Sequence, residues 1–453
     1  MSIGSQAATA VLSAGIIVFS CGISRAQTTA PATGTTSSAN GQQKTKDLEK
    51  AKNYFERTFT ITGQIRERWE GPEGKNFTVT PADSYVLSRL RLGLWYRPLT
   101  WIRFYGEAQD SRALFYDKSP SSAVSDPFDW RQGYVEVGAE EGAGWTLRVG
   151  RQDLFIGSNR LLTTGDWSNV TKPYDIARGN FSSGILSVDL IAGSQVLPDP
   201  GRMDRSKPGE HLYVAYTALK KLIPGASIEP YLMAKTQCLV KGKEGASGGA
   251  DTLYPGGRII GTTPGRLDYT IEGVREAGSY ANDSINAWGY IGGGGWTVAP
   301  SLGKLRVSSD FTFASGDDGK KDHVHDQFDF LYGSQQTPTS LTGLFAWRNI
   351  EDFRAGVDFR PLKKLTAKLD YRNYWLATVA DGLYNSSGTE TVINAKATSN
   401  HIGEGAEIQL VYALNVKTSF GGGVGTLSPG AYLVQSKKTN GYTYPYFYFQ
   451  RSF

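Results

Sequence analysis

The most regular feature of the chain is an alternation of apolar and polar residues that begins near Thr58 and recurs almost to the C-terminus. In the segment 59–69, FTITGQIRERW, apolar side chains share one face, and Thr, Gln and Arg share the other. The same pattern returns in segments 86–96, 101–109, 134–137, 186–190, 305–313, 353–359 and 365–374. A period of two residues is typical of β-strands with two different faces. The chain is therefore predicted to be all-β.

The last strand that this pattern predicts is strongly aromatic, in the segment 441–453, GYTYPYFYFQRSF. Tyr occupies every second position from Tyr442 to Tyr448, and the Phe residues fall in the other register. Such a strand suits a membrane barrel, whose aromatic residues lie at the membrane interface and whose closure leaves no free edge. An aromatic edge strand of a soluble β-sandwich is the alternative. The ending in Phe453 resembles the insertion signal of bacterial outer-membrane barrels, which implies the barrel-insertion machinery as a partner.

Short turns and long polar insertions divide the predicted strands. Turns such as 97–100 and 360–364 are short, whereas five insertions are long: 110–129, 196–210, 237–266, 316–348 and 378–404. Short turns at one end and long loops at the other are the pattern of outer-membrane barrels. We therefore predict a single transmembrane antiparallel β-barrel of about 18 strands over residues 58–453.

Composition and charge agree with this fold. The mean hydropathy is −0.33, as expected where polar lumen-facing residues offset apolar lipid-facing ones. The 48 basic and 43 acidic residues are interspersed, so we expect no nucleic-acid partner. Charges on one face of so many strands would be costly in a dry core, which predicts a water-filled lumen.

The N-terminus predicts export from the cytoplasm. Residues 1–26 carry a short apolar run, Ala10–Cys21, and a small-x-small site that ends at Ala26, as in a secretory signal peptide. A lipoprotein signal at Cys21 is the alternative. Residues 27–57 are expected to be a flexible periplasmic lead, part of which could form a short helix. The predicted location is the outer membrane of a Gram-negative cell.

The densest chemistry lies in the segment 148–178. It combines basic residues with carboxylates, an amide and an aromatic ring: Arg148, Arg151, Arg160, Asp166, Trp167, Asn169, Asp175 and Arg178. Guanidinium groups bind carboxylates in a planar, bidentate manner, so these residues could contact an anionic sugar. Salt bridges that brace a barrel wall are an equally good interpretation.

This segment resembles the alginate export family of outer-membrane porins. The likeness is carried by Gly150-Arg151-Gln152, by Arg160-Leu161, by Asp166-Trp167-Ser168-Asn169 and by Tyr174-Asp175 with Arg178. A weaker block includes Trp347-Arg348-Asn349, and Arg348 joins the candidate path on that basis. The resemblance implies a monomeric 18-stranded barrel whose electropositive constriction passes an anionic polysaccharide outward.

The strand pattern predicts a basic surface inside the barrel. Five arginines share the polar face of three consecutive strands: Arg66, Arg68, Arg89, Arg91 and Arg103. Fixed positive charges would lower the entry barrier for an anionic polysaccharide or a small anionic solute. A general or nutrient-uptake porin is the first alternative, and an outer-membrane enzyme with a Ser/His or Asp/His group is the second.

No reaction, cofactor or metal is expected from the sequence. No nucleophile is framed by a base and an oxyanion motif. The stretch 322–326, DHVHD, offers carboxylates and imidazoles to a metal but lacks a full set of ligands at a recognised spacing. A solvated polar loop is the better interpretation.

Overall fold

The structure is a computed structural model that describes residues 54–55, 57–80, 83–116, 120–139, 144–301, 303–319, 322–333, 340 and 343–453. The predicted signal peptide (1–26) and nearly all of the predicted lead (27–57) lie outside the described residues. The part described in detail here is the unit that begins at Phe55.

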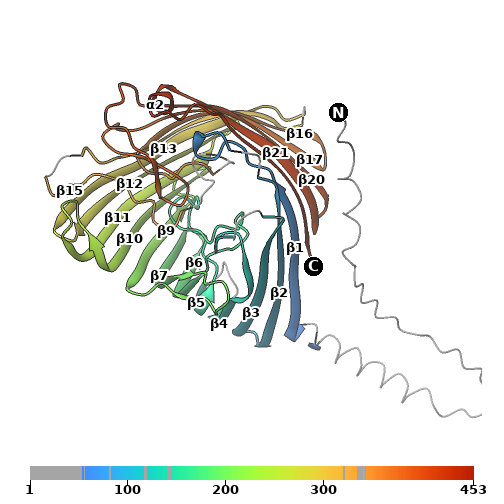
Figure 1. Cartoon of the computed structure of the whole chain (residues 1–453). Coiled ribbons are helices and arrows are strands. Elements are labelled where there is room, and N and C mark those ends of the chain that lie inside the picture. The colour runs from blue at the N-terminus through green and yellow to red at the C-terminus, as the bar shows by residue number, and fades with distance from the viewer. Residues whose placement is uncertain are drawn as a thin grey trace, which may run out of the picture. The chain divides into compact units, whose positions relative to one another are not determined.

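Eighteen long strands form one closed antiparallel barrel (Figure 1). In chain order they are β1 (Phe59–Glu70), β2 (Tyr85–Leu99), β3 (Ile102–Leu114), β4 (Asp126–Gly138), β5 (Gly144–Gln152), β6 (Tyr174–Ser183), β7 (Leu186–Leu197), β9 (Glu210–Lys220), β10 (Ala226–Lys241), β11 (Ser247–Thr262), β12 (Leu267–Tyr280), β13 (Asp283–Ala299), β14 (Leu305–Ala314), β16 (Ile350–Leu362), β17 (Leu365–Trp375), β20 (His401–Asn415), β21 (Thr418–Pro429) and β22 (Tyr442–Ser452).

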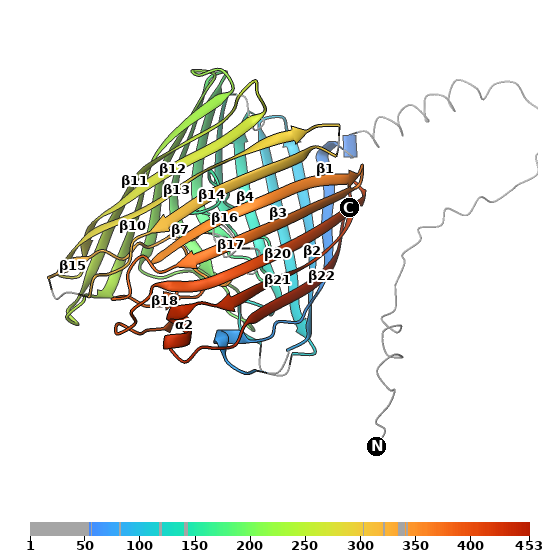
Figure 2. The ribbon, with the colours of Figure 1, turned by 90° about the horizontal axis from the view of Figure 1, so that it is seen from above.

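Each of these strands pairs with its neighbours in the chain, and β22 pairs with β1 to close the ring. The closing seam joins Gln64–Glu70 of β1 to Tyr446–Ser452 of β22, seven residue pairs, whereas β1 and β2 share twelve. Figure 2 shows the strands side by side and inclined around the barrel, as closure requires. The fold class and the strand number predicted from the alternation are confirmed.

The alternation of residue types becomes an inside and an outside. On β2, Leu90, Leu92 and Leu94 keep 46–55% of their surface exposed on the outer wall, whereas Arg89 and Arg91 are buried inside. On β22, Tyr442 and Tyr446 point inward and Phe447 outward. A wall that is apolar outside and polar inside is what a barrel in lipid needs.

The two ends of the barrel differ. Turns at one end are short, as between β2 and β3 or β20 and β21. The other end carries most of the longer connections, with the small elements η1 (Lys75–Phe77), β8 (Arg205–Ser206), β15 (Val324–His325), β18 (Leu383–Tyr384), β19 (Glu390–Val392) and α2 (Ala431–Gln435).

One predicted insertion is wrong. Residues 237–266 were expected to form a long loop, but they contain the end of β10, a turn, and all of β11. Gly248, Gly249, Gly256 and Gly257 interrupt the apolar–polar alternation of β11, so its strand period is hidden. Of the described residues, no helix is long and apolar enough to cross a membrane.

Candidate functional site

The candidate site is built around the connection between β5 and β6, residues 153–173, which we call the lumen loop. The loop folds into the barrel (Figure 1) and contacts two distant parts of its wall. Near its end it binds β1 and β2. Near its middle, Ser158 and Arg160 bind Glu272 of β12, with Ser158 Oγ donating to Glu272 Oε2 at 2.8 Å. The lumen loop therefore crosses the interior.

Four inward-facing arginines hold the lumen loop on β1 and β2, and we call them the arginine cluster: Arg66, Arg68, Arg89 and Arg91. Arg66 donates to the carbonyl oxygen of Asp166 at 2.9 Å and to those of Trp167 and Ser168 at 3.0 Å. Arg89 donates to the carbonyls of Asp166 and Ser168 at 2.9 and 3.0 Å. Two guanidinium groups thus share three consecutive carbonyl groups of the loop.

The other two arginines of the cluster also bind carboxylates. Arg91 Nη1 donates to Asp166 Oδ1 at 2.8 Å, and Arg68 Nε to Glu70 Oε1 at 2.6 Å. Arg68 also lies 4.3 Å from the centre of the Trp167 ring. That ring packs edge-on against Tyr446 and Tyr448 of β22, so the loop covers the closing seam from inside.

Asp166 lies in the lumen loop, outside the membrane-spanning strands, and its side chain keeps 48% of its surface exposed. Burial raises the pKa of its carboxyl, but the positive charges of Arg91, Arg89 and Arg66 outweigh that effect. The pKa of Asp166 is therefore held well below its usual range. This carboxylate stays ionised among the arginines.

Asn169 fixes the end of the lumen loop. Its side-chain amide donates to the carbonyls of Ser88 (3.2 Å), Arg112 (3.2 Å) and Val124 (2.8 Å). Ser111 Oγ donates to the carbonyl oxygen of Asn169 at 2.9 Å. Asn169 is 1% exposed, so its role in this structure is to position the loop.

The remaining predicted arginines of the wall are paired with carboxylates. Arg103 and Arg148 both bind Glu136, at 2.7 and 2.5 Å. The other pairs are Arg151 with Asp175 at 2.9 Å and Arg178 with Asp189 at 2.7 Å. These contacts match the salt-bridge interpretation of the sequence, although a role in a substrate path remains a prediction.

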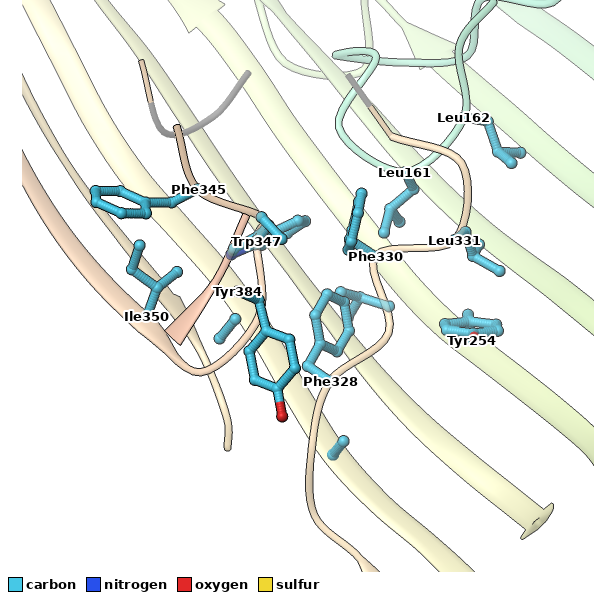
Figure 3. Close-up of a cluster of buried hydrophobic side chains, with 14 of the residues drawn as sticks. Leu161, Leu162, Tyr254, Phe328, Phe330, Leu331, Phe345, Trp347, Ile350 and Tyr384 are labelled. Carbon is cyan, nitrogen blue, oxygen red and sulfur yellow. The ribbon is translucent and has the colours of Figure 1, made fainter. Parts of the chain in front are cut away.

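A second connection meets the lumen loop inside the barrel: residues 315–349, between β14 and β16. Tyr332 N donates to Leu161 O at 2.9 Å, and Thr163 N donates to Tyr332 O at 3.2 Å. Leu161 and Leu162 lie opposite Phe328, Phe330 and Leu331, while Trp347 and Tyr384 extend the cluster (Figure 3). Arg348, predicted on the substrate path, binds Asp329 at 3.1 Å within this connection.

The five predicted arginines on the inner face of β1–β3 are buried, each at most 7% exposed. Loop carbonyl groups, side-chain amides and carboxylates accept their hydrogen bonds. A water-filled lumen stays a prediction. Between the loops remains a cavity of about 340 Å³, lined by Asp166, Trp167, Lys172 and Tyr332 among others.

Two charged residues of the interior, Arg131 and Lys235, were not among the site residues predicted from the sequence. Arg131 of β4 binds Glu107 and Asp153, and Lys235 of β10 binds Asp329. The alternation of β10 was the available signal for Lys235, whereas Arg131 lies at an irregularity of β4 that interrupts the alternation of that strand. The stretch 322–326 is a paired polar loop in this structure: His323 and His325 lie 2.9 and 3.2 Å from Asp283.

Comparison with known proteins identifies a family and a fold. A family model described as alginate export matches residues 57–445. A search of curated proteins gave no significant match. Three similar crystal structures each cover 87% of this chain and 98% of their own: Pseudomonas aeruginosa OccK8 (OprE; TM-score 0.60, 8% identity), Acinetobacter baumannii OccAB2 (0.58, 8%) and P. aeruginosa OpdK with vanillate (0.56, 10%). At these identities the likeness shows the fold alone.

Proposed function

Because this chain belongs to the alginate export family and forms an outer-membrane β-barrel, we propose that it is a channel for an anionic polysaccharide or a related anionic solute. The observation that carries the proposal is the arginine cluster. Among the described residues, its four guanidinium groups hydrogen-bond to two carboxylates, Glu70 and Asp166. Their other acceptors are carbonyl groups and the amides of Gln64 and Gln109, which are neutral.

A guanidinium group that donates to neutral acceptors keeps its positive charge. Such a charge inside a barrel attracts anions far more strongly than it would in water, because the surroundings screen it less. The cluster also has unused capacity, since Arg66 Nε, Arg89 Nε and Arg91 Nη2 have no hydrogen-bond partner. These N–H groups are buried, so carboxylates of a solute would supply the acceptors that they lack once the lumen loop is displaced.

The position of the lumen loop bears on which anions could pass the cluster. It lies directly on the cluster and crosses toward β12, so a long polymer has to displace it or pass beside it. The cavity of about 340 Å³ is large enough for a small solute. This observation supports a second candidate, the uptake of small carboxylates, and makes the size of the anion the property to test.

The test is conductance of the purified protein in a planar bilayer. We expect polymannuronate or polyguluronate to block the current, and a neutral glucan of matched length to leave it unchanged. Block by short anionic sugars or simple carboxylates alone would select the second candidate. A channel that shows no anion preference and no block by either class would refute both.

A further inference from the structure

A group of three carboxylates lies away from the arginine cluster, where β4 meets the connection between β7 and β9. One carboxylate oxygen from each of Asp126, Asp129 and Asp204 lies within 4.8 Å of those of the other two. Asp126 and Asp129 belong to β4, and Asp204 precedes β8. Three like charges therefore meet where the strand rim touches the connection.

The backbone of β4 is irregular where the two aspartates meet. Residues three apart on a regular strand point to opposite faces. Here Asp126 pairs with Ser111 and Asp129 with Gln109, so β4 carries one residue more than β3 between these pairs. Phe128, within this bulge, has φ of +42°. The bulge lets Asp126 and Asp129 share one face, and strain of this kind often accompanies a functional site.

Two of the carboxylates are buried, the third is half-buried, and none of the three forms an ion pair among the described residues. Asp126 and Asp129 are each 4% exposed, and Asp126 Oδ1 has no hydrogen-bond partner. Asp129 accepts from the backbone N–H of Asp204 at 2.8 Å. Among the ion pairs of the described residues, none involves any of the three aspartates. The nearby Arg151 donates to the carbonyl oxygen of Asp204 and to the carboxylate of Asp175 instead.

We propose that Asp126, Asp129 and Asp204 bind a divalent cation of the Ca²⁺ class, which fastens the connection between β7 and β9 to the rim of β4. Carboxylates this close repel each other unless one takes up a proton or a cation lies between them, and a cation would neutralise all three at once. The donor set consists of oxygens alone, which suits a hard cation and not Zn²⁺. Ca²⁺ accepts flexible geometry and water as further ligands, so three carboxylates suffice as its anchor.

A second acidic group of the chain provides the control. Asp318, Asp322 and Asp326 also approach within 4.8 Å of one another. Lys243 lies 3.4 Å from Asp322, however, and Asp322 is exposed. This group is partly neutralised already and has water available, so it does not need a cation.

The experiment uses the full purified barrel, stripped with a chelator, and measures binding of Ca²⁺ by calorimetry and of Tb³⁺ by luminescence. Trp130 follows Asp129 directly, and its excitation sensitises bound Tb³⁺. We expect Asp126→Asn to weaken Ca²⁺ binding about tenfold or more, because one of three charged ligands is lost. Asp322→Asn is expected to bind as the unmodified protein does.

Protection from trypsin provides a second readout. Arg202 and Arg205 flank Asp204 and are exposed, so Ca²⁺ should slow cleavage there in the unmodified protein but not in Asp126→Asn. If Asp126→Asn does not fold, Asp204→Asn in the connection replaces it. The proposal is overturned if the unmodified barrel binds no Ca²⁺, or if both variants of the site bind it with unchanged affinity.

Discussion

The arginine cluster and two other inward-facing arginines, Arg306 of β14 and Arg354 of β16, differ in the partners that they bind. Arg354 binds Asp310 and Asp370, both at 2.6 Å, and Arg306 binds Asp268 and Asp358 at 2.6 and 2.9 Å. Asp310, Asp358 and Asp370 lie on strands adjacent to those of their arginines, and Asp268 lies on β12, two strands from Arg306. The cluster on β1 and β2, by contrast, depends on carbonyl groups of a loop about a hundred residues away in the chain.

This difference in partners distinguishes arginines that are neutralised by carboxylates of the wall from arginines that are held mainly by the lumen loop. Arg354 is neutralised by partners that the barrel itself supplies, and it needs no loop. Arg66 and Arg89 face each other across β1 and β2, and their repulsion is offset by backbone carbonyl groups of the lumen loop together with the Asp166 carboxylate, which lies 3.3 Å from Arg89. A movement of that loop would expose positive charge at the cluster and change nothing at Arg354.

The largest effect is expected from removing the lumen loop. Replacing residues 157–171 with a short Gly–Ser linker should raise single-channel conductance several-fold, because the loop crosses the lumen. Circular dichroism and heat-dependent gel mobility would show that the barrel still forms. Unchanged conductance in a folded variant would mean that the loop does not obstruct the path.

Stability should distinguish the two kinds of arginine. Arg354→Gln leaves two partly buried carboxylates without their cation and should cost roughly 2–4 kcal/mol in the free energy of unfolding. Arg89→Gln leaves mainly carbonyl and amide acceptors, keeps Asp166 paired with Arg91 and relieves repulsion with Arg66, so about 1–2 kcal/mol is expected.

Guanidinium-induced unfolding of the barrel in lipid vesicles measures both values. The double variant Asp310→Asn with Arg354→Gln serves as the control and should recover part of the loss. If Arg354→Gln and Arg89→Gln lowered the free energy of unfolding equally, the proposed difference between the wall arginines and the arginine cluster would be wrong.

Ion selectivity should show the opposite order from stability, with the larger change at the arginine cluster and the smaller one at Arg354. Arg89→Gln with Arg91→Gln removes two positive charges that share a single carboxylate, Asp166, so the reversal potential in a salt gradient should shift toward cations. The neutral exchange Asp310→Asn with Arg354→Gln should leave the reversal potential nearly unchanged. Unaltered selectivity in the Arg89/Arg91 variant would contradict a basic path through the cluster.

The smallest expected effect concerns the stability of the protein at acid pH. Since the pKa of Asp166 is lowered in the folded protein, its pairing with Arg91 stabilises the fold fully above the ordinary carboxyl pKa of about 4. That contribution is lost only as the pH falls through the lower folded pKa. A double-mutant cycle with Asp166→Asn and Arg91→Gln should give equal coupling at pH 7 and pH 5. A loss already at pH 5 would show that the cluster does not hold this carboxylate ionised.

The sequence was sufficient for the barrel but not for its interior. Alternation on strands such as β2 reports which residues face lipid, because each outward position has to be apolar. Strand β11 was missed since its glycines carry no side chain to show the period. The arginines were correctly placed on three neighbouring strands, yet their partners could not be foreseen: backbone carbonyl groups leave no trace in the sequence, and the fold of a loop decides which ones are near.

The position of Trp167 has a consequence for the order of assembly. Its ring touches Arg68 of the first strand and two tyrosines of the last, at a seam of only seven residue pairs. Those surfaces are adjacent only when the two ends of the chain have met. The loop can therefore settle only when the barrel closes or afterwards, and once settled it slows reopening of the seam. The lumen loop, which lies across the interior of the finished barrel, would in this way also be the last part of the chain to fold.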